Sequence, residues 1–115
     1  MPLKITWKDQ YEKEIERAIQ ARNDGNEGMA RVCARRAAGI VIGEYLILCG
    51  YSGLNNSVYD HLTLFNHLPD VAEDLKEVSR HMLMKVNQEH KLPVDTDLIH
   101  EVIWLKDRLL TDNKR

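Results

Sequence analysis

The sequence MARVCARRAAGIVIGEYL, residues 29–46, is the segment that decides the fold of this 115-residue chain. Its small and branched apolar residues recur at helical spacing on more than one face, a pattern typical of a central helix with several neighbours. It also contains three arginines and two glycines, which are unusual residue types for the interior of a buried helix. We therefore expect a central helix at residues 27–49, and its arginines and glycines are the first candidates for function.

The rest of the sequence predicts further helices around this central one. Thr6 is suited to cap a helix at residues 7–22, with Asp9 as a weaker capping-box partner, and Gly25 lies in the turn that ends it. Apolar stripes at helical spacing predict three more helices, at residues 58–68, 69–87 and 96–110. No segment alternates long enough to be a convincing strand. We expect an all-α fold, an up-and-down bundle of about five helices, with residues 1–115 as a single domain.

Capping residues and prolines mark where the later helices should begin and end. Pro69 suits the first position of the helix at 69–87, because its missing N–H would have no partner there. Pro93 should break the chain after that helix. Asp95 or Thr96 is expected to cap the last helix.

The charge and hydropathy of the chain argue against two classes of function. The formal net charge is −2 at pH 7, whereas general nucleic-acid binders are more often basic, so nucleic acid can be argued only from a local patch. The longest apolar run, residues 37–49, is interrupted by Glu44 and is shorter than the roughly 20 residues of a membrane-spanning helix. Residues 1–4 lead into a mixed segment without a signal-peptide pattern. We expect neither membrane insertion nor secretion.

The two cysteines indicate a reducing compartment. Cys33 and Cys49 fall in the same predicted helix, where their separation in sequence corresponds to roughly 24 Å along the axis. A disulfide needs Cα atoms within about 7 Å, so the two cannot bond within one chain. We interpret both as buried structural thiols, and free thiols favour the cytoplasm.

The titratable residues show no catalytic or metal-binding pattern. The chain has five histidines, and no two have the i, i+3 or i, i+4 spacing of a helical metal pair. They are His61, His67, His81, His90 and His100. Neither cysteine belongs to a nucleophile motif, and no phosphate-binding glycine loop occurs. Glu44 is expected to pair with a cation or to point outward, with a role as a catalytic acid as the alternative. We predict no metal, no cofactor and no catalytic residues.

The arginines of the central helix are the candidate binding residues. Arg31 and Arg35 are four positions apart and share one side of the helix, and Arg36 lies about 100° further around. With Arg22 they form the densest cationic cluster in the chain. Arginine binds carboxylate or phosphate through its two-pronged guanidinium. These arginines therefore either bind a phosphate or a partner, or they form internal salt bridges. The acids considered for salt bridges are Glu14, Glu16, Glu73 and Asp74.

Gly39 and Gly43 lie one turn apart on the central helix. Each costs up to about 1 kcal/mol relative to alanine in a helix interior, a cost that is tolerated where another backbone must come close. That neighbour is either another helix of the same chain or the same helix of a second subunit across a two-fold axis. The second alternative makes Gly39 and Gly43 a candidate dimer interface.

With its helices placed, the chain resembles the HEPN superfamily of small helical domains. The resemblance lies in ARRAAGIVIGEYL, residues 34–46, and YDHLTLFNHL, residues 59–68, and extends over about residues 10–110. RNA-cleaving members carry an Arg-x4-6-His motif that acts at a dimer interface, and no arginine here is followed by a histidine at that spacing. Gly39 also replaces the family's core glutamate. The resemblance implies a binding or accessory domain without the usual nuclease site, in some cases working beside a nucleotidyltransferase-like partner.

Two functions follow as hypotheses. The first is a non-enzymatic helical module, a homodimer, that binds a protein partner or the phosphate of RNA or a nucleotide. The alternative is an unconventional ribonuclease or other nucleotide-acting enzyme, with a site assembled at a dimer interface from histidines and Glu44. Two or more histidines in one cleft with an arginine would favour the enzyme.

Overall fold

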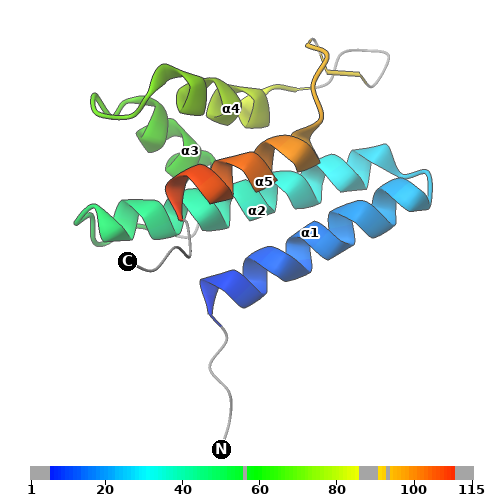
Figure 1. The fold of residues 1–115 in the computed structure, drawn as a ribbon, viewed down its shortest axis with the longest axis horizontal. Coiled ribbons are helices and arrows are strands. Elements are labelled where there is room, and N and C mark those ends of the chain that lie inside the picture. Colours follow the sequence, from blue (N-terminus) through cyan, green and yellow to red (C-terminus); the bar gives the residue numbers. More distant parts are fainter. Residues whose placement is uncertain (1–5, 56, 86–90, 93, 111–115) are drawn as a thin grey trace, which may run out of the picture.

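The computed structural model describes residues 6–55, 57–85, 91–92 and 94–110, and within these residues the chain forms five helices and no strand (Figure 1). The helices are α1 (Trp7–Asn23), α2 (Glu27–Leu48), α3 (Val58–Asn66), α4 (Glu73–Leu83) and α5 (Leu98–Leu109). The predicted all-α bundle is confirmed. None of the helices in the described part of the chain is both long and apolar enough to cross a bilayer.

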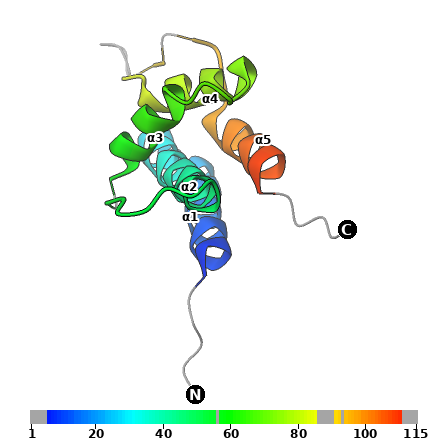
Figure 2. The same ribbon diagram turned by 90° about the vertical axis from the view of Figure 1, so that its left-hand side faces the viewer.

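The second helix is the centre of the bundle, as its sequence predicts. It contacts each of the other four helices. Figure 1 shows α1 and α2 as an antiparallel hairpin, with α5 lying along α2. Both views place α1 on one side of α2, with α3 and α4 on the other (Figures 1 and 2). The other four helices are thus packed around α2.

Small side chains on α2 allow its neighbours to come close. Four alanines of this helix are completely buried, namely Ala30, Ala34, Ala37 and Ala38. Larger core residues fill the space between the helices, and the ring of Phe65 meets Tyr45 edge to face with centroids 5.7 Å apart. On the α4 side, the buried hydroxyl of Ser79 donates a hydrogen bond to the carbonyl oxygen of Leu62. One hydrophobic core thus includes residues from all five helices.

The start of α1 follows its sequence signals closely. The amide of Asp9 donates to the hydroxyl of Thr6, and the amide of Thr6 donates to the carboxylate of Asp9, which is a complete capping box. Gly25 takes the left-handed conformation, with φ of +81°. The side chain of Asn26 then caps α2 through the amide of Met29. These local hydrogen bonds explain why the first two helices end within one residue of their predicted bounds.

The predicted bounds of the fourth helix are wrong. We expected residues 69–87, whereas α4 begins at Glu73 and ends at Leu83. Residues 69 and 70 form a turn, and Ala72 precedes the helix without a side-chain cap. Met84 leaves the helix with an extended backbone, ψ of 145°. The helix therefore ends before the predicted residue 87, which lies outside the described residues, as does the predicted break at Pro93.

The last helix is capped by a residue that the sequence analysis did not choose. Asp97, and neither Asp95 nor Thr96, accepts hydrogen bonds from the amides of Ile99 and His100. Its other carboxylate oxygen accepts a hydrogen bond from Arg22. Asp97 thus caps α5 and also joins the start of this helix to α1.

The interpretation of both cysteines as buried is half right. Cys33 is 2% exposed, whereas Cys49 follows the end of α2 and is exposed. Both are free thiols.

Candidate functional site

The three arginines singled out in the sequence converge on one groove between α2, α3 and α4. This groove has a volume of about 800 Å³, and we call it the arginine groove. Its lining residues are Glu27, Gly28, Arg31, Val32, Arg35, Arg36, Val58, Tyr59, Leu62, Met82, Leu83, Met84 and Lys85. Four of these are basic and one is acidic. The structure thus joins the predicted binding residues to a segment at the end of α4 that sequence reasoning did not connect with them.

The floor of the arginine groove is apolar. Leu62 and Met82 are buried, and Val58 and Met84 are half-buried along its sides. Tyr59 lies at its edge and is 65% exposed. A volume of this size lies in the usual range for ligand sites, and methionine side chains adapt readily to different apolar surfaces. The arrangement suits a ligand that combines negative charge with an apolar face.

Arg35 has a structural role in this groove. Its Nε donates to the carbonyl oxygen of Met82 over 2.7 Å, and its second guanidinium nitrogen donates to the carbonyl oxygen of Met84 over 3.0 Å. The last carbonyls of a helix lack partners within the helix, and a cation there is also favoured by the helix dipole. Burial lowers the pKa of Arg35, as does the neighbouring charge of Arg31. Arg35 therefore binds the end of α4, a role that neither sequence alternative included.

The remaining cations of the groove stand at its edge. Arg36 and Lys85 are exposed, and Arg31 is half-buried near Glu27. Three of the acids considered as internal partners are paired elsewhere. Glu14 binds Arg17, Glu73 binds Arg80, and Asp74 binds Arg108.

Arg22 does not join the arginine groove, contrary to the cluster expected from the sequence. It makes two hydrogen bonds to Glu27, of 3.0 and 2.6 Å, and one of 2.9 Å to Asp97. These bonds lower the pKa of Glu27. Burial alone would raise the pKa of Asp97, but the bonds from Arg22 and from backbone amides outweigh it and the pKa is lowered. Arg22 thus ties together the end of α1, the start of α2 and the start of α5.

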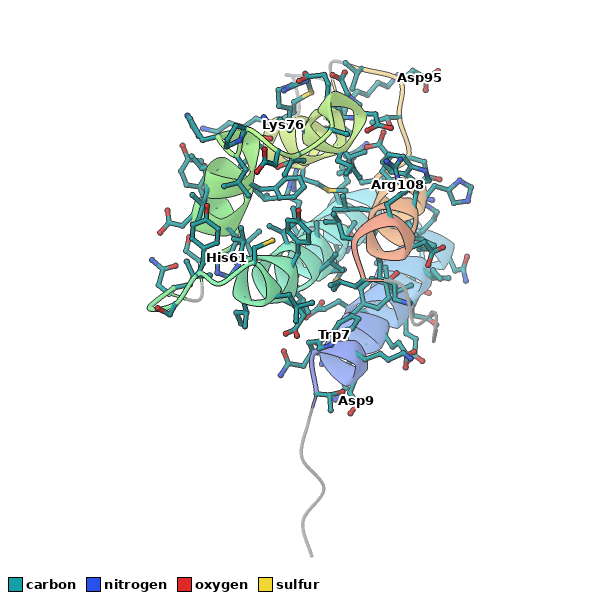
Figure 3. The ribbon with its side chains drawn as sticks, turned by 60° about the vertical axis from the view of Figure 1, so that its left-hand side comes forward. Trp7, Asp9, His61, Lys76, Asp95 and Arg108 are labelled. Atoms are coloured by element: carbon teal, nitrogen blue, oxygen red, sulfur yellow. The ribbon has the colours of Figure 1, made fainter. Side chains whose placement is uncertain are left out.

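A second hollow, which we call the α1–α3 cleft, borders the arginine groove. It has a volume of about 350 Å³ and shares Arg36 and Val58 with the groove. Its lining residues are Trp7, Gln10, Arg36, Gly39, Ile40, Gly43, Glu44, Ile47, Leu54, Asn55, Val58 and His61. Figure 3 shows Trp7 at the start of α1 and His61 on α3. Glu44 is half-buried in this cleft and makes no hydrogen bond or ion pair within the described part of the chain.

The close neighbour of the two glycines is α3 of the same chain. A Cβ placed on Gly39 would lie 2.7 Å from Cγ2 of Val58, and one on Gly43 would lie 2.9 Å from Cε1 of His61. Both glycines are buried. The first sequence alternative, packing within the chain, therefore holds. The alternative in which Gly39 and Gly43 themselves contact a second subunit is not supported, because Val58 and His61 of α3 occupy the space over them.

The ring of His61 is fixed by the backbone on both sides. Its Nδ1 lies 3.2 Å from the carbonyl oxygen of Gly39, and its Nε2 lies 2.8 Å from the carbonyl oxygen of Asn55. Among the residues that the structure describes, no histidine lines the arginine groove, and His61 alone lines the α1–α3 cleft. Neither hollow therefore meets the condition stated for the enzyme hypothesis, two histidines with an arginine.

The side chains of two of the other three described histidines have defined neighbours. His81 lies between two carboxylates, with Nδ1 2.9 Å from Glu101 and Nε2 3.3 Å from Glu77. Nδ1 of His67 lies 2.8 Å from the carbonyl oxygen of Thr63. His90 is outside the described residues. In the part of the chain that the structure covers, no three histidine, cysteine, aspartate or glutamate side chains converge in a way that could hold a metal.

Comparisons with known proteins give no relative of this chain. No family model matches it, and neither the curated proteins nor the solved structures include a significant match.

Proposed function

We propose that this protein is a non-enzymatic binding module whose arginine groove takes up an acidic, amphipathic segment of a protein partner. The observation that carries the proposal is the convergence of four basic residues over an apolar floor in a chain of net charge −2. The acid in the lining, Glu27, is already bound by Arg22. The described lining of the groove thus holds four basic side chains and one acid, in a chain whose formal net charge is negative.

The division of roles among the basic residues supports a peptide ligand. Arg35 shapes the groove by holding the end of α4, while Arg36 and Lys85 are exposed at its edge. Carboxylates on one face of a helical segment would meet these edge cations, and its apolar face would cover Leu62 and Met82. This is the general mode in which an amphipathic helix binds a groove.

The floor of the groove favours protein over RNA. Single-stranded RNA is bound largely by stacking bases on aromatic or arginine side chains. The described lining of the groove has one aromatic side chain, Tyr59, and three arginines, which stand around a floor of aliphatic and methionine side chains. Such a floor gives bases no flat surface on which to stack. An RNA or nucleotide phosphate held by Arg31 and Arg36 is the competing outcome, and the experiment below separates the two.

Several finer parts of the proposal rest on the sequence. The HEPN-like relationship, and with it a nucleotidyltransferase-like partner, rests on the resemblance of residues 34–46 and 59–68 alone. The cytoplasmic location rests on the two free thiols. The homodimer expected from the sequence needs a surface other than Gly39 and Gly43.

The enzyme alternative, a ribonuclease or other nucleotide-acting protein, has less support. A histidine that acts as a general base needs a ring nitrogen within reach of substrate, and both ring nitrogens of His61 face backbone carbonyls. His81 is likewise placed between Glu77 and Glu101, away from the arginine groove. We expect no cleavage of single-stranded or structured RNA by the purified protein.

The test uses a fluorescent helical peptide with leucines on one face and glutamates on the other. We expect binding that weakens steeply with added salt and falls about tenfold or more in Arg31→Gln/Arg36→Gln. Arg17→Gln is the matched control, because Arg17 is exposed on α1 and pairs with Glu14 outside the groove.

Two further ligands make the result decisive. The same peptide with lysines in place of glutamates should not bind. Equal binding of both peptides, or no binding of either, contradicts the proposal. Binding of a short single-stranded RNA that requires Arg31 and Arg36, without binding of the acidic peptide, would establish the RNA alternative.

A further inference from the structure

A charged stripe on α2 faces the α1–α3 cleft, and its two charged side chains make no ion pair with the residues that the structure describes. Arg36, Ile40 and Glu44 occupy successive turns of the helix and all line this cleft. Arg36 is exposed, and the other two are half-buried. The positive and the negative side chain thus lie at equal distances on either side of Ile40.

This arrangement is complementary to itself. A two-fold axis passing near Ile40 turns the stripe end for end, so that Arg36 of each copy faces Glu44 of the other. Two-fold dimers use the same patch on both subunits, and such a patch must satisfy its own charges in this way. We infer that the Arg36–Ile40–Glu44 stripe is the surface on which a second copy of this chain docks.

The surroundings of Glu44 favour pairing with a cation from a second copy. Its carboxylate makes no hydrogen bond or ion pair within the described residues. The cleft around it is lined by apolar Ile40, Ile47 and Leu54 as well as by polar Gln10, Asn55 and His61. A half-buried carboxylate beside apolar side chains is unfavourable unless a cation or donor pairs with it. Arg36 lies two turns away on the same helix and also makes no ion pair within the described part of the chain. A second copy supplies the partner for both groups at once.

Exposed apolar side chains extend the same surface. Ile47, which lines the cleft, is 58% exposed, and Leu48 beside it is 68% exposed. Large apolar residues that are exposed next to one another mark contact surfaces more often than isolated ones do. The stripe therefore combines an apolar part with a charge pattern that selects the orientation of the partner.

The glycines of α2 line the same cleft but keep their contacts within each copy. Val58 and His61 of α3 occupy the space over Gly39 and Gly43, so the docking surface uses the stripe beside them. Arg36 lines both hollows, so the dimer would fix one edge of the groove without entering its apolar floor. The inference does not rest on the proposed function, because it needs no third molecule.

The test uses two charge-reversal variants, Arg36→Glu and Glu44→Arg, in sedimentation velocity over a range of concentrations. Each variant places like charges opposite each other at both symmetry-related contacts, and we expect its dimer dissociation constant to rise about a hundredfold. An equimolar mixture of the two variants restores opposite charges at both contacts. The mixture should therefore form a heterodimer, although neither variant forms a homodimer.

The controls cover the other outcomes. Glu16→Arg, an exposed reversal on α1 outside the cleft, should leave the association unchanged. Circular dichroism establishes that each variant is folded, and Ile47→Glu replaces any reversal variant that is not. The inference is overturned if the natural chain is a monomer at all concentrations, if both reversal variants remain dimers, or if their mixture stays monomeric.

Discussion

The Nε of Arg35 lies 2.7 Å from the carbonyl oxygen of Met82 and donates a hydrogen bond to it. This bond links the centre of α2 to the end of α4 across the arginine groove. A second bond from the same guanidinium reaches the carbonyl oxygen of Met84, where the chain has left the helix. In the sequence, Arg35 looks like a ligand-binding residue. In the structure, it holds the end of α4, which forms one wall of the groove.

The first prediction concerns the stability that Arg35 supplies. Arg35→Gln removes two charge-assisted hydrogen bonds and leaves two carbonyls without their partner. We expect the free energy of unfolding in urea to fall by about 2–4 kcal/mol. Lys13→Gln is the control, since this cation is exposed on α1 and lines neither hollow, and its effect should stay within about 0.5 kcal/mol. Equal effects of the two substitutions would assign Arg35 no structural role.

The second prediction concerns the two buried glycines. Gly39→Ala and Gly43→Ala each place a methyl group within 3.0 Å of a side chain on α3. Val58 is branched at Cβ and the ring of His61 is held by two backbone carbonyls, so neither yields easily. We expect the free energy of unfolding to fall by about 1–3 kcal/mol, in spite of alanine's better helix propensity.

Gly28→Ala provides the comparison for these variants. Gly28 lies in the first turn of α2, and a Cβ there would meet only the side chain of Asn26, at 3.7 Å. This substitution should leave stability unchanged or raise it by up to about 1 kcal/mol. Gly43→Leu, whose larger side chain points at His61, should prevent stable folding. A folded Gly43→Leu protein of natural stability would contradict the close approach of α3.

The local parts of the fold could be predicted from sequence, and the groove could not. Thr6, Asp9 and Gly25 act through hydrogen bonds within a few residues, so their pattern places α1 and the start of α2 correctly. The start of α4 has no such signal, because Ala72 precedes it without a side-chain cap. Pro69, which suits a helix start, lies in a turn instead.

The same distinction applies to the candidate site. The arginines and glycines of α2 are visible as unusual residues in a buried helix, so the sequence identifies them as candidates. Their roles depend on neighbours far along the chain. The role of Arg35 depends on its hydrogen bonds to Met82 and Met84, and that of Gly39 depends on its close contact with Val58. These neighbours are far apart in the sequence, so no spacing pattern reveals the contacts.

The third prediction concerns acid stability. The pKa of Glu27 and that of Asp97 are both lowered in the folded protein, where Arg22 binds their carboxylates. A lowered folded pKa stabilises the fold above the unfolded pKa values, about 4.5 and 3.8, and this contribution is lost as the pH falls through the folded values. Urea unfolding at a series of pH values should therefore show stability declining below about pH 4.5.

Replacement of the cation isolates this contribution. Arg22→Met removes the partner of both carboxylates and should lower stability near neutral pH. The difference between the natural chain and this variant should then shrink as the pH falls below about 4.5, because protonated carboxyls no longer pair with Arg22. A difference that does not change with pH would show that Arg22 contributes through packing and not through its ion pairs.

The last prediction concerns the two thiols, which the structure places in opposite environments. Cys33 is 2% exposed, and burial raises the pKa of its thiol, so little reactive thiolate forms at neutral pH. Cys49 is exposed just after α2. In the native protein, an aromatic disulfide reagent should therefore titrate one thiol quickly and a second only after denaturation. Cys49→Ser should remove the fast reaction, whereas Cys33→Ser should keep it. Two fast thiols in the native protein would mean that the α1–α2 hairpin opens readily, since Cys33 belongs to the same buried core as Ala30, Ala34 and Ala37.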